Sequence, residues 1–196
     1  MINEAIVLAG GMGTRLKEVV ADIPKPMAEI NGKPFLYYLN NYLIKNGITH
    51  IILSVGYKSD IIKKYFGTGN KSVKISYAIE ETPLGTGGGI RCAMKYANNQ
   101  HVFIVNGDTL FNIRLQELAD LHQEKNAALT MALRRMKDGS RYGSVVTDHS
   151  NKIIAFHEKK DDIKNVLING GTYLIDKHLF LTKNFPEKFS MLSFMK

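Results

Sequence analysis

Near its start the sequence reads Ala5-Ile6-Val7-Leu8-Ala9-Gly10-Gly11-Met12-Gly13-Thr14-Arg15, an apolar run that leads directly into a glycine-rich segment. Such a run is typical of a strand buried on both faces. The closely spaced glycines permit positive φ angles and a close approach of the backbone to a ligand. Successive N–H groups in such a loop can surround an anion. The stretch predicts a buried strand and a phosphate-binding loop, with a structural strand-to-helix turn as the alternative.

Two cationic side chains support the phosphate interpretation. Arg15 offers a planar, permanently charged group suited to phosphate oxygens. Lys25 lies between Pro24 and Pro26, which fix φ and favour an extended conformation at the lysine. A stiff backbone reduces the entropy that is lost when the lysine contacts a phosphate. The loop is not a Walker A loop, because no Lys-Ser/Thr pair follows the glycines at the required spacing, and it is not G-x-G-x-x-G.

Length and composition narrow the class of protein. The 196 residues indicate a single domain. The formal net charge of +8 favours phosphate-bearing ligands, and a solvated basic surface would explain it equally well. The lysines are scattered, so nucleic-acid binding is the weaker explanation. A single cysteine fits a reducing compartment. The sequence has no signal peptide and no apolar run of about 20 residues, so we expect a cytoplasmic location and no membrane segment.

The hydrophobic periodicity alternates between strand and helix through the first half of the chain. After the first strand we expect helices over residues 35–46, 61–66, 90–97 and 115–124, and strands over residues 50–55, 73–79, 101–105 and 127–134. Ser59 or Asp60 is expected to cap the second helix. The second half predicts an antiparallel hairpin, 142–148 with 153–157, then a strand over 167–175 and a short helix near Asp176. The pattern predicts an α/β fold with a mostly parallel, doubly wound sheet.

Polar candidates follow three of the predicted parallel strands. The loop 10–15 follows the first strand, the segment 80–89 the third, and Asp108 the fourth. Ligands bind at the carboxyl ends of strands in open α/β sheets, so these groups should converge. Asp108 facing phosphates would need a cation between them, and Mg²⁺ prefers one or two carboxylates plus substrate oxygens. The alternative is that Asp108 or Thr109 caps a following turn.

Further candidates are carboxylates and glycines near the ends of strands. Glu80 or Glu81 could accept N–H donors from a guanine edge, and both could equally be exposed acids. The lysines after Glu158 could reach a second phosphate or be solvated. Asn169-Gly170-Gly171 indicates a bulge, a bend or a close-lying ligand. The histidines lack metal-ligand spacing, and no Ser-His-Asp or Cys-His pattern emerges, which is consistent with direct displacement.

The segment Leu8–Arg15, followed by Pro24-Lys25-Pro26-Met27, resembles the signature of the sugar-1-phosphate nucleotidylyltransferases, and the resemblance extends over residues 2–189. It implies a Rossmann-like three-layer α/β/α sandwich with a mostly parallel mixed sheet and an antiparallel hairpin. It implies transfer of a nucleoside monophosphate from a nucleoside triphosphate to a sugar 1-phosphate, with release of pyrophosphate and with Mg²⁺ as cofactor. The scattered lysines and the lack of a long apolar run lead us to expect no nucleic-acid or membrane partner.

The same resemblance implies roles for individual residues. Catalytic roles fall to Arg15, Lys25 and Asp108, with Asp108 as the magnesium ligand. The nucleotide-binding set is Leu8, Gly10, Gly11, Gly13, Thr14, Glu80, Gly85 and Thr86. The sugar-phosphate set is Asn106, Gly143, Glu158, Lys159, Asn169 and Gly171.

Three further stretches refine the resemblance. Residues 83–88 are similar to guanylyltransferases, and residues 54–58, 140–145 and 168–173 look most like the group that acts on D-glycero-α-D-manno-heptose 1-phosphate for surface polysaccharide synthesis. Mannose 1-phosphate guanylyltransferases and amino-sugar 1-phosphate uridylyltransferases are the alternatives.

The end of the sequence departs from the family pattern at Met191-Leu192-Ser193-Phe194-Met195-Lys196. The family continues for about one more strand and helix, which usually supply a second aspartate to the metal. We therefore expect a truncated chain with weak magnesium affinity and a tendency to form homo-oligomers. An impaired homologue that still binds nucleotide is the alternative from a different functional class.

Overall fold

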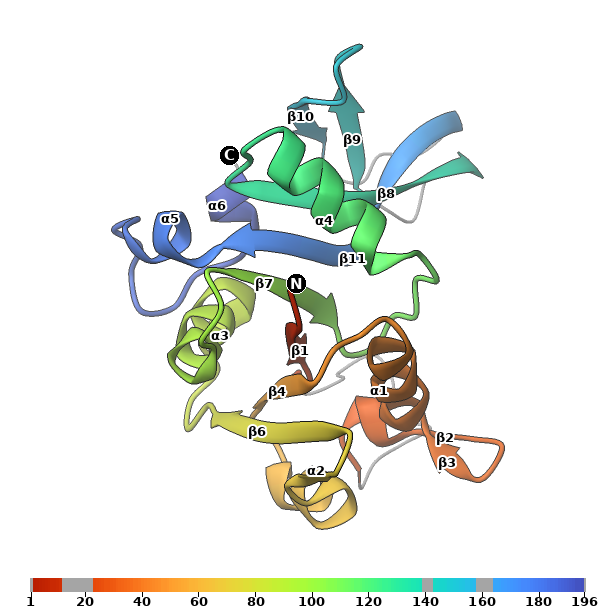
Figure 1. Ribbon diagram of the computed structural model, residues 1–196, viewed down its shortest axis with the longest axis vertical. Helices are drawn as coiled ribbons and strands as arrows, with labels where there is room; N and C mark the ends of the chain where they lie inside the picture. Colours follow the sequence, from red (N-terminus) through yellow and green to blue (C-terminus); the bar gives the residue numbers. More distant parts are fainter. Residues whose placement is uncertain (1, 12–22, 139–142, 158–163, 196) are drawn as a thin grey trace.

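The centre of the protein is a mixed sheet built on four adjacent parallel strands (Figure 1), seen in a computed structural model that describes residues 2–11, 23–138, 143–157 and 164–195. The strand order is β10-β9-β11-β7-β1-β4-β6-β5, with β8 also paired to β11. The parallel strands are β1 (Glu4–Leu8), β4 (His50–Val55), β6 (Val73–Ile79) and β7 (His101–Asn106). The antiparallel strands are β5 (Gly69–Asn70), β8 (Leu129–Asp138), β9 (Ser144–Thr147), β10 (Ile153–His157) and β11 (Lys164–Asp176).

Helices cover both faces of the sheet and make three layers. On one face lie α1 (Phe35–Lys45), α2 (Ser59–Phe66) and α4 (Leu115–Glu124). On the other lie α3 (Gly85–Ala93), α5 (Lys177–Leu181) and α6 (Leu192–Met195). The 3₁₀ helices η2 (Lys25–Met27) and η3 (Met94–Tyr96), and a ribbon of β2 (Glu29–Ile30) with β3 (Lys33–Pro34), complete the elements described. Among the described residues, no helix combines the length and apolar character needed to cross a membrane.

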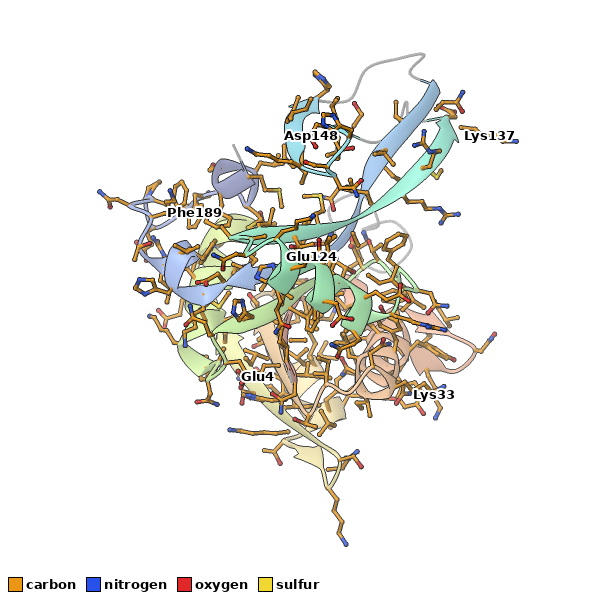
Figure 2. All side chains as sticks on the ribbon, turned by 45° about the horizontal axis from the view of Figure 1, so that its top comes forward. Glu4, Lys33, Glu124, Lys137, Asp148 and Phe189 are labelled. Carbon is orange, nitrogen blue, oxygen red and sulfur yellow. The ribbon has the colours of Figure 1, made fainter. Side chains whose placement is uncertain are left out.

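Alternation along β1 explains why both faces need helices. Val7 packs in the cluster that includes Leu39 of α1, whereas Ile6 packs in the cluster that includes Ile90 of α3. Both strand residues are fully buried, as the central strand of a parallel sheet requires. Lys33, just before α1, and Phe189, which packs against α3, accordingly lie on opposite sides of the molecule (Figure 2). The predicted α/β class, the parallel sheet and the antiparallel hairpin are confirmed.

Three local predictions were wrong. The helix expected over residues 90–97 begins at Gly85 and continues as η3. The N-cap of α2 is Lys58, with a φ of 51° and no side-chain cap, so Ser59 and Asp60 lie inside the helix. Lys25 begins the short helix η2 and is not extended, because the following proline and Met27 are buried in the core. Tertiary packing there outweighs the preference of a residue before proline.

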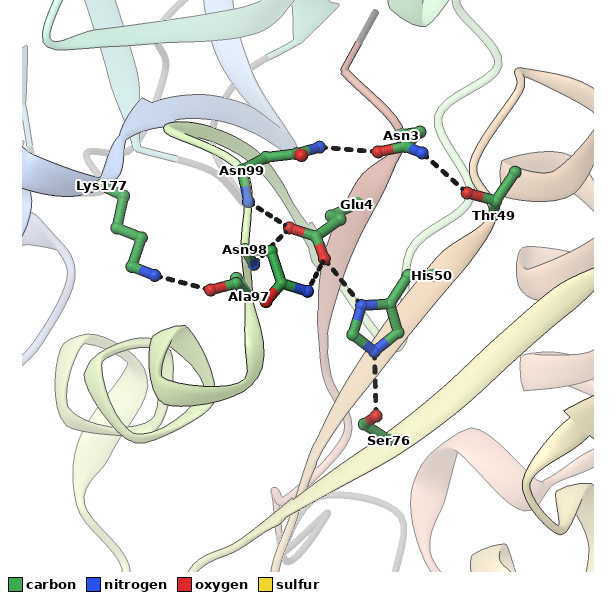
Figure 3. A network of polar contacts seen from close by, with 9 residues as sticks. All are labelled: Asn3, Glu4, Thr49, His50, Ser76, Ala97, Asn98, Asn99 and Lys177. Atoms are coloured by element: carbon green, nitrogen blue, oxygen red, sulfur yellow. Dashed lines mark hydrogen bonds and ion pairs between the residues drawn. The ribbon is translucent and has the colours of Figure 1, made fainter.

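A buried carboxylate ties together the amino ends of the parallel strands (Figure 3). Glu4 is 3% exposed. One carboxylate oxygen accepts hydrogen bonds from His50 Nδ1 at 2.8 Å and Asn98 Nδ2 at 3.2 Å, and the other from the backbone N–H groups of Asn98 and Asn99 at 2.7 and 2.6 Å. Burial acts to raise the pKa of Glu4, but these hydrogen bonds outweigh it and lower the pKa below its ordinary value.

Candidate active site

A cavity of about 740 Å³ opens at the carboxyl ends of four parallel strands, β1, β4, β6 and β7. Its size falls within the range of about 300–1,000 Å³ that is usual for small-molecule sites. The residues that line it come from the last positions of β1 and β7, from the loops after the four strands and from the start of α3: Leu8, Gly10, Gly11, Gly56, Tyr57, Glu80, Glu81, Pro83, Gly85, Thr86, Asn106 and Asp108. The expected convergence of the strand-end loops is therefore present in the fold.

The register of the strands brings these loops to one level. Leu8 at the end of β1 is paired with Ser54 of β4 on one side and with Asn106 of β7 on the other. The Gly107 N–H donates to the Leu8 carbonyl at 2.9 Å. A Cβ atom at Gly107 would lie 2.5 Å from that carbonyl oxygen, so the close approach of the two loops requires glycine.

Glu80 stands between the loop after β1 and the start of α3. Its Oε1 accepts a hydrogen bond from Ser54 Oγ at 2.8 Å, and its Oε2 accepts one from the Leu84 N–H at 3.1 Å. A Cβ atom at Gly10 would lie 3.1 Å from Oε1, so the first glycine loop packs directly against this carboxylate. Glu80 thus shapes the wall of the cavity, and it retains lone pairs for an incoming donor.

Lys25 pairs with Asp108, which lines the cavity, although 83 positions separate the two residues in the sequence. Among the described residues, Lys25 itself is not part of the lining. Lys25 Nζ lies 2.5 Å from Asp108 Oδ2, with the two side chains 36% and 41% exposed. The other carboxylate oxygen of Asp108 accepts from the Thr109 hydroxyl at 3.2 Å. Asp108 lies in the turn that follows β7, and the next helix, α4, begins at Leu115 with Arg114 as its N-cap, so Asp108 caps no described helix.

The sugar-phosphate candidates are only partly brought together. A Cβ atom at Gly171 would lie 2.7 Å from Asn106 Nδ2, so this strand glycine packs against a residue that lines the cavity. Asn169 Oδ1 accepts from the Gly171 N–H at 2.8 Å and fixes the bulge in β11. Gly143 lies just before β9, and a Cβ atom there would lie 3.0 Å from the His157 carbonyl oxygen. Gly143 is not one of the described residues that line the cavity.

Several predicted residues lie outside the described part of the chain. These are Gly13, Thr14 and Arg15 of the first glycine-rich loop, and Glu158 and Lys159 after β10. Their expected contacts with phosphates and sugar stay predictions.

Four residues that line the cavity, Gly56, Tyr57, Glu81 and Pro83, were missing from the predicted site sets, although Glu81 was named as an alternative to Glu80. Gly56 and Tyr57 follow β4, and Tyr57 is 43% exposed. The rule that selected the other loops also applies here, because β4 is parallel to β1 and ends beside it. The signal was therefore present in the strand pattern, although the loop carries no carboxylate or glycine-rich motif.

The residues present fit a magnesium ion that is held mainly by a substrate. In the described part of the chain, no group of three or more His, Cys, Asp or Glu side chains could form a complete protein cage. Asp108 supplies one partly exposed carboxylate at the rim of the cavity. Mg²⁺ commonly uses one or two carboxylates together with phosphate oxygens, so a single carboxylate facing the cavity suits that mode of binding.

Comparison with known proteins gives consistent matches. The nucleotidyl transferase family model matches residues 4–189. The D-glycero-alpha-D-manno-heptose 1-phosphate guanylyltransferase of Aneurinibacillus thermoaerophilus is 47% identical over 95% of this chain and 80% of its own length. The enzyme of that name from Campylobacter jejuni is 46% identical over 98% of this chain and 85% of its own length. The crystal structure of HddC from Yersinia pseudotuberculosis complexed with GMP-PN has a TM-score of 0.84, with 38% identity over 96% of this chain and 83% of that one.

Proposed function

The chain belongs to the nucleotidyl transferase family, and we propose that within it the chain transfers a guanylyl group from GTP to D-glycero-α-D-manno-heptose 1-phosphate. A phosphate oxygen of the sugar 1-phosphate attacks the α-phosphorus of GTP. The bond from that phosphorus to the bridging oxygen breaks, pyrophosphate leaves, and GDP-heptose forms. The guanine base and the heptose in this proposal rest on the two relatives that are 46–47% identical.

The observation that carries the proposal is the cavity lined both by the first glycine loop and by Asp108, whose carboxylate pairs with Lys25. In-line phosphoryl-type transfer depends on positioning and on stabilisation of charge, and it needs no protein nucleophile. The backbone N–H groups near Gly10 and Gly11 are suited to phosphate oxygens. Lys25 supplies a cation for the triphosphate, and we propose the same role for Arg15.

Asp108 would hold Mg²⁺ together with the phosphate oxygens. When bound, the ion supplies Lewis-acid neutralisation of the charge on the leaving pyrophosphate. Without substrate, the Lys25 ammonium balances the charge of the Asp108 carboxylate, with 2.5 Å between Lys25 Nζ and Asp108 Oδ2. Nucleotide binding would then release Lys25 from the carboxylate and let it donate to phosphate. The pair thereby keeps both charges compensated before the substrate arrives.

The base and sugar sites complete the proposal. Glu80 accepts the N–H donors of guanine, and the wall at Gly85 and Thr86 lies beside the base. Asn106 and Gly171, which pack together, contact the sugar phosphate with Glu158 and Lys159. Asn169 supports this contact through its bond to the Gly171 N–H, 2.8 Å long.

The test is pyrophosphate release from a grid of four nucleoside triphosphates and several sugar 1-phosphates, with the products identified by mass spectrometry. We expect GTP with the heptose 1-phosphate to give the highest kcat/KM. A preference for mannose 1-phosphate, or for UTP with an amino-sugar 1-phosphate, would replace the proposed substrates. GTP binding without turnover on any acceptor would contradict the proposed activity.

A further inference from the structure

The first turn of α3 is hydrogen-bonded to a distant part of the chain. Gly87 and Gly88 donate their backbone N–H groups to the Phe189 carbonyl at 3.0 and 3.3 Å. The Phe189 N–H in turn donates to the Leu84 carbonyl at 3.0 Å. Among the described residues no side chain caps α3, and the Phe189 carbonyl accepts hydrogen bonds from the start of the helix, where N–H groups lack partners within the helix.

The glycines of α3 are explained by this packing. A Cβ atom at Gly85 would lie 2.6 Å from the Phe189 carbonyl oxygen, and one at Gly88 would lie 2.6 Å from the Glu187 carbonyl oxygen. A Cβ atom at Gly87 would overlap the Phe189 ring. The glycines at the start of α3 therefore leave room for residues 185–191, here called the C-terminal strap. Within α3, the residues that line the cavity are Gly85 and Thr86.

Arg91 holds the strap at its other end. Its Nη1 donates to the Phe185 carbonyl at 2.9 Å, and its Nη2 donates to the carbonyls of Pro186 and Glu187 at 2.8 and 3.0 Å. The guanidinium also lies 5.1 Å from the centre of the Phe189 ring. A single planar side chain on α3 thus fixes three successive carbonyl groups, which the point charge of a lysine could not do as completely.

The strap is connected to the cavity wall. Thr86 Oγ1 accepts a hydrogen bond from the Met191 N–H at 2.8 Å, just beyond the contacts of Phe189. Thr86 and the neighbouring Gly85 are part of the cavity lining, and Leu84 donates to the Glu80 carboxylate. Strap bonds to Leu84, Thr86, Gly87 and Gly88 therefore fix the same short segment that forms one wall of the site.

We propose that Arg91 is a positioning residue for the nucleotide site, acting through the C-terminal strap on the wall at Gly85 and Thr86. The inference rests on the proposed function, since it takes the cavity to be the nucleotide pocket. Arg91 itself does not line that cavity, so its effect is on the geometry of the wall and not on contact with the substrate.

The test compares Arg91→Ala, Arg91→Lys and the control Arg114→Ala with the wild type. Arg114 is an exposed arginine beside α4 whose ion pair with Glu117 is equally exposed. GTP affinity is measured by calorimetry, KM for the sugar 1-phosphate at saturating GTP, and backbone exchange of residues 84–93 by hydrogen–deuterium mass spectrometry.

We expect Arg91→Ala to weaken GTP binding about tenfold, the equivalent of one lost net hydrogen bond, and to speed exchange at Gly87 and Gly88. KM for the sugar 1-phosphate should change less than about twofold, and Arg91→Lys should restore part of the GTP affinity, since one cation can still reach a carbonyl. The Arg114→Ala control should match the wild type.

Unchanged GTP affinity beside a lowered melting temperature would overturn the inference, as would equal shifts in both substrate constants. If Arg91→Ala does not fold, Arg91→Lys carries the test by the same readouts. If the wild type binds no GTP, the proposed function fails by itself. Hydrogen–deuterium exchange at Gly87 and Gly88 then still tests whether Arg91 orders the cavity wall. Equal exchange there in Arg91→Ala and the wild type would refute the role of Arg91.

Discussion

Replacing Glu4 by glutamine should lower the free energy of unfolding, because this one carboxylate accepts hydrogen bonds from four donors. His50 Nδ1 and Asn98 Nδ2 donate to one oxygen, and the N–H groups of Asn98 and Asn99 donate to the other (Figure 3). Glutamine has the same shape but keeps one acceptor oxygen, and its amide nitrogen would face two donors. Two of the four hydrogen bonds are therefore lost in a buried place.

The magnitude follows from these two bonds. Hydrogen bonds to charged groups contribute about 1.5–3 kcal/mol each, so the lower bound for the loss is about 3 kcal/mol. Breaking a buried pair by removing one partner costs about 3–5 kcal/mol, which agrees. For a chain of this size, a loss of about 3 kcal/mol lowers the melting temperature by about 6–12 °C.

Urea unfolding at pH 7 measures the effect, with Glu124→Gln as the matched control. Glu124 is exposed and its ion pair is with the neighbouring Lys125, so its loss should change stability by less than about 0.5 kcal/mol. The pKa of Glu4 is lowered from 4.5, so the carboxylate stabilises the fold above pH 4.5, and this stabilisation is lost as the pH falls through the folded pKa. The difference between wild type and Glu4→Gln should therefore shrink in acid. Equal stability of the two glutamine variants at pH 7 would refute the reasoning.

Three other predictions concern the core, α3 and the site. Burial and the nearby charge of His101 lower the pKa of His122 from 6.5 to about 4, so the free energy of unfolding should fall as the pH drops from 6.5 towards 4. In urea titrations, His122→Gln should make this dependence on pH less steep. The same dependence on pH in the variant and the wild type would contradict the prediction. Gly88→Ala should destabilise the fold by about 2 kcal/mol in thermal melts despite the better helix propensity of alanine, because its Cβ would lie 2.6 Å from the Glu187 carbonyl oxygen; a stabilised variant would exclude that clash. Lys25→Met should reduce kcat/KM for GTP by about 10–100-fold in a pyrophosphate-release assay, with unchanged kinetics as the contrary result.

The fold was largely predictable because its signals are local. The predicted bounds of β4, β6 and α4 agree with the structure, since each has a clear period and a clear end. Helix α1 ends just before Gly47, whose φ of 85° is a conformation that favours glycine. The parallel strands could be predicted because strands and helices alternate along the sequence, and this alternation is also a local signal.

The errors lie where distant contacts decide the structure. Gly85–Gly89 is a poor helix former by itself, and the Phe189 carbonyl caps it from the far end of the sequence. The carboxyl-end rule predicted that Asp108 lies near the first glycine loop. It could not predict the ion pair with Lys25, because no parallel strand positions that lysine. It would also have found Tyr57, had the loop after β4 been treated like the others.

The most direct test of the active-site assignment is kcat/KM for GTP as a function of Mg²⁺ concentration in Asp108→Asn. Asp120→Asn is the matched control, because Asp120 is an exposed helix residue bonded to the Gln116 side chain at 2.7 Å. We expect Asp108→Asn to lose about 100-fold or more in kcat/KM and to require more Mg²⁺, while Asp120→Asn behaves like the wild type. Unchanged turnover and unchanged Mg²⁺ demand in Asp108→Asn would contradict it.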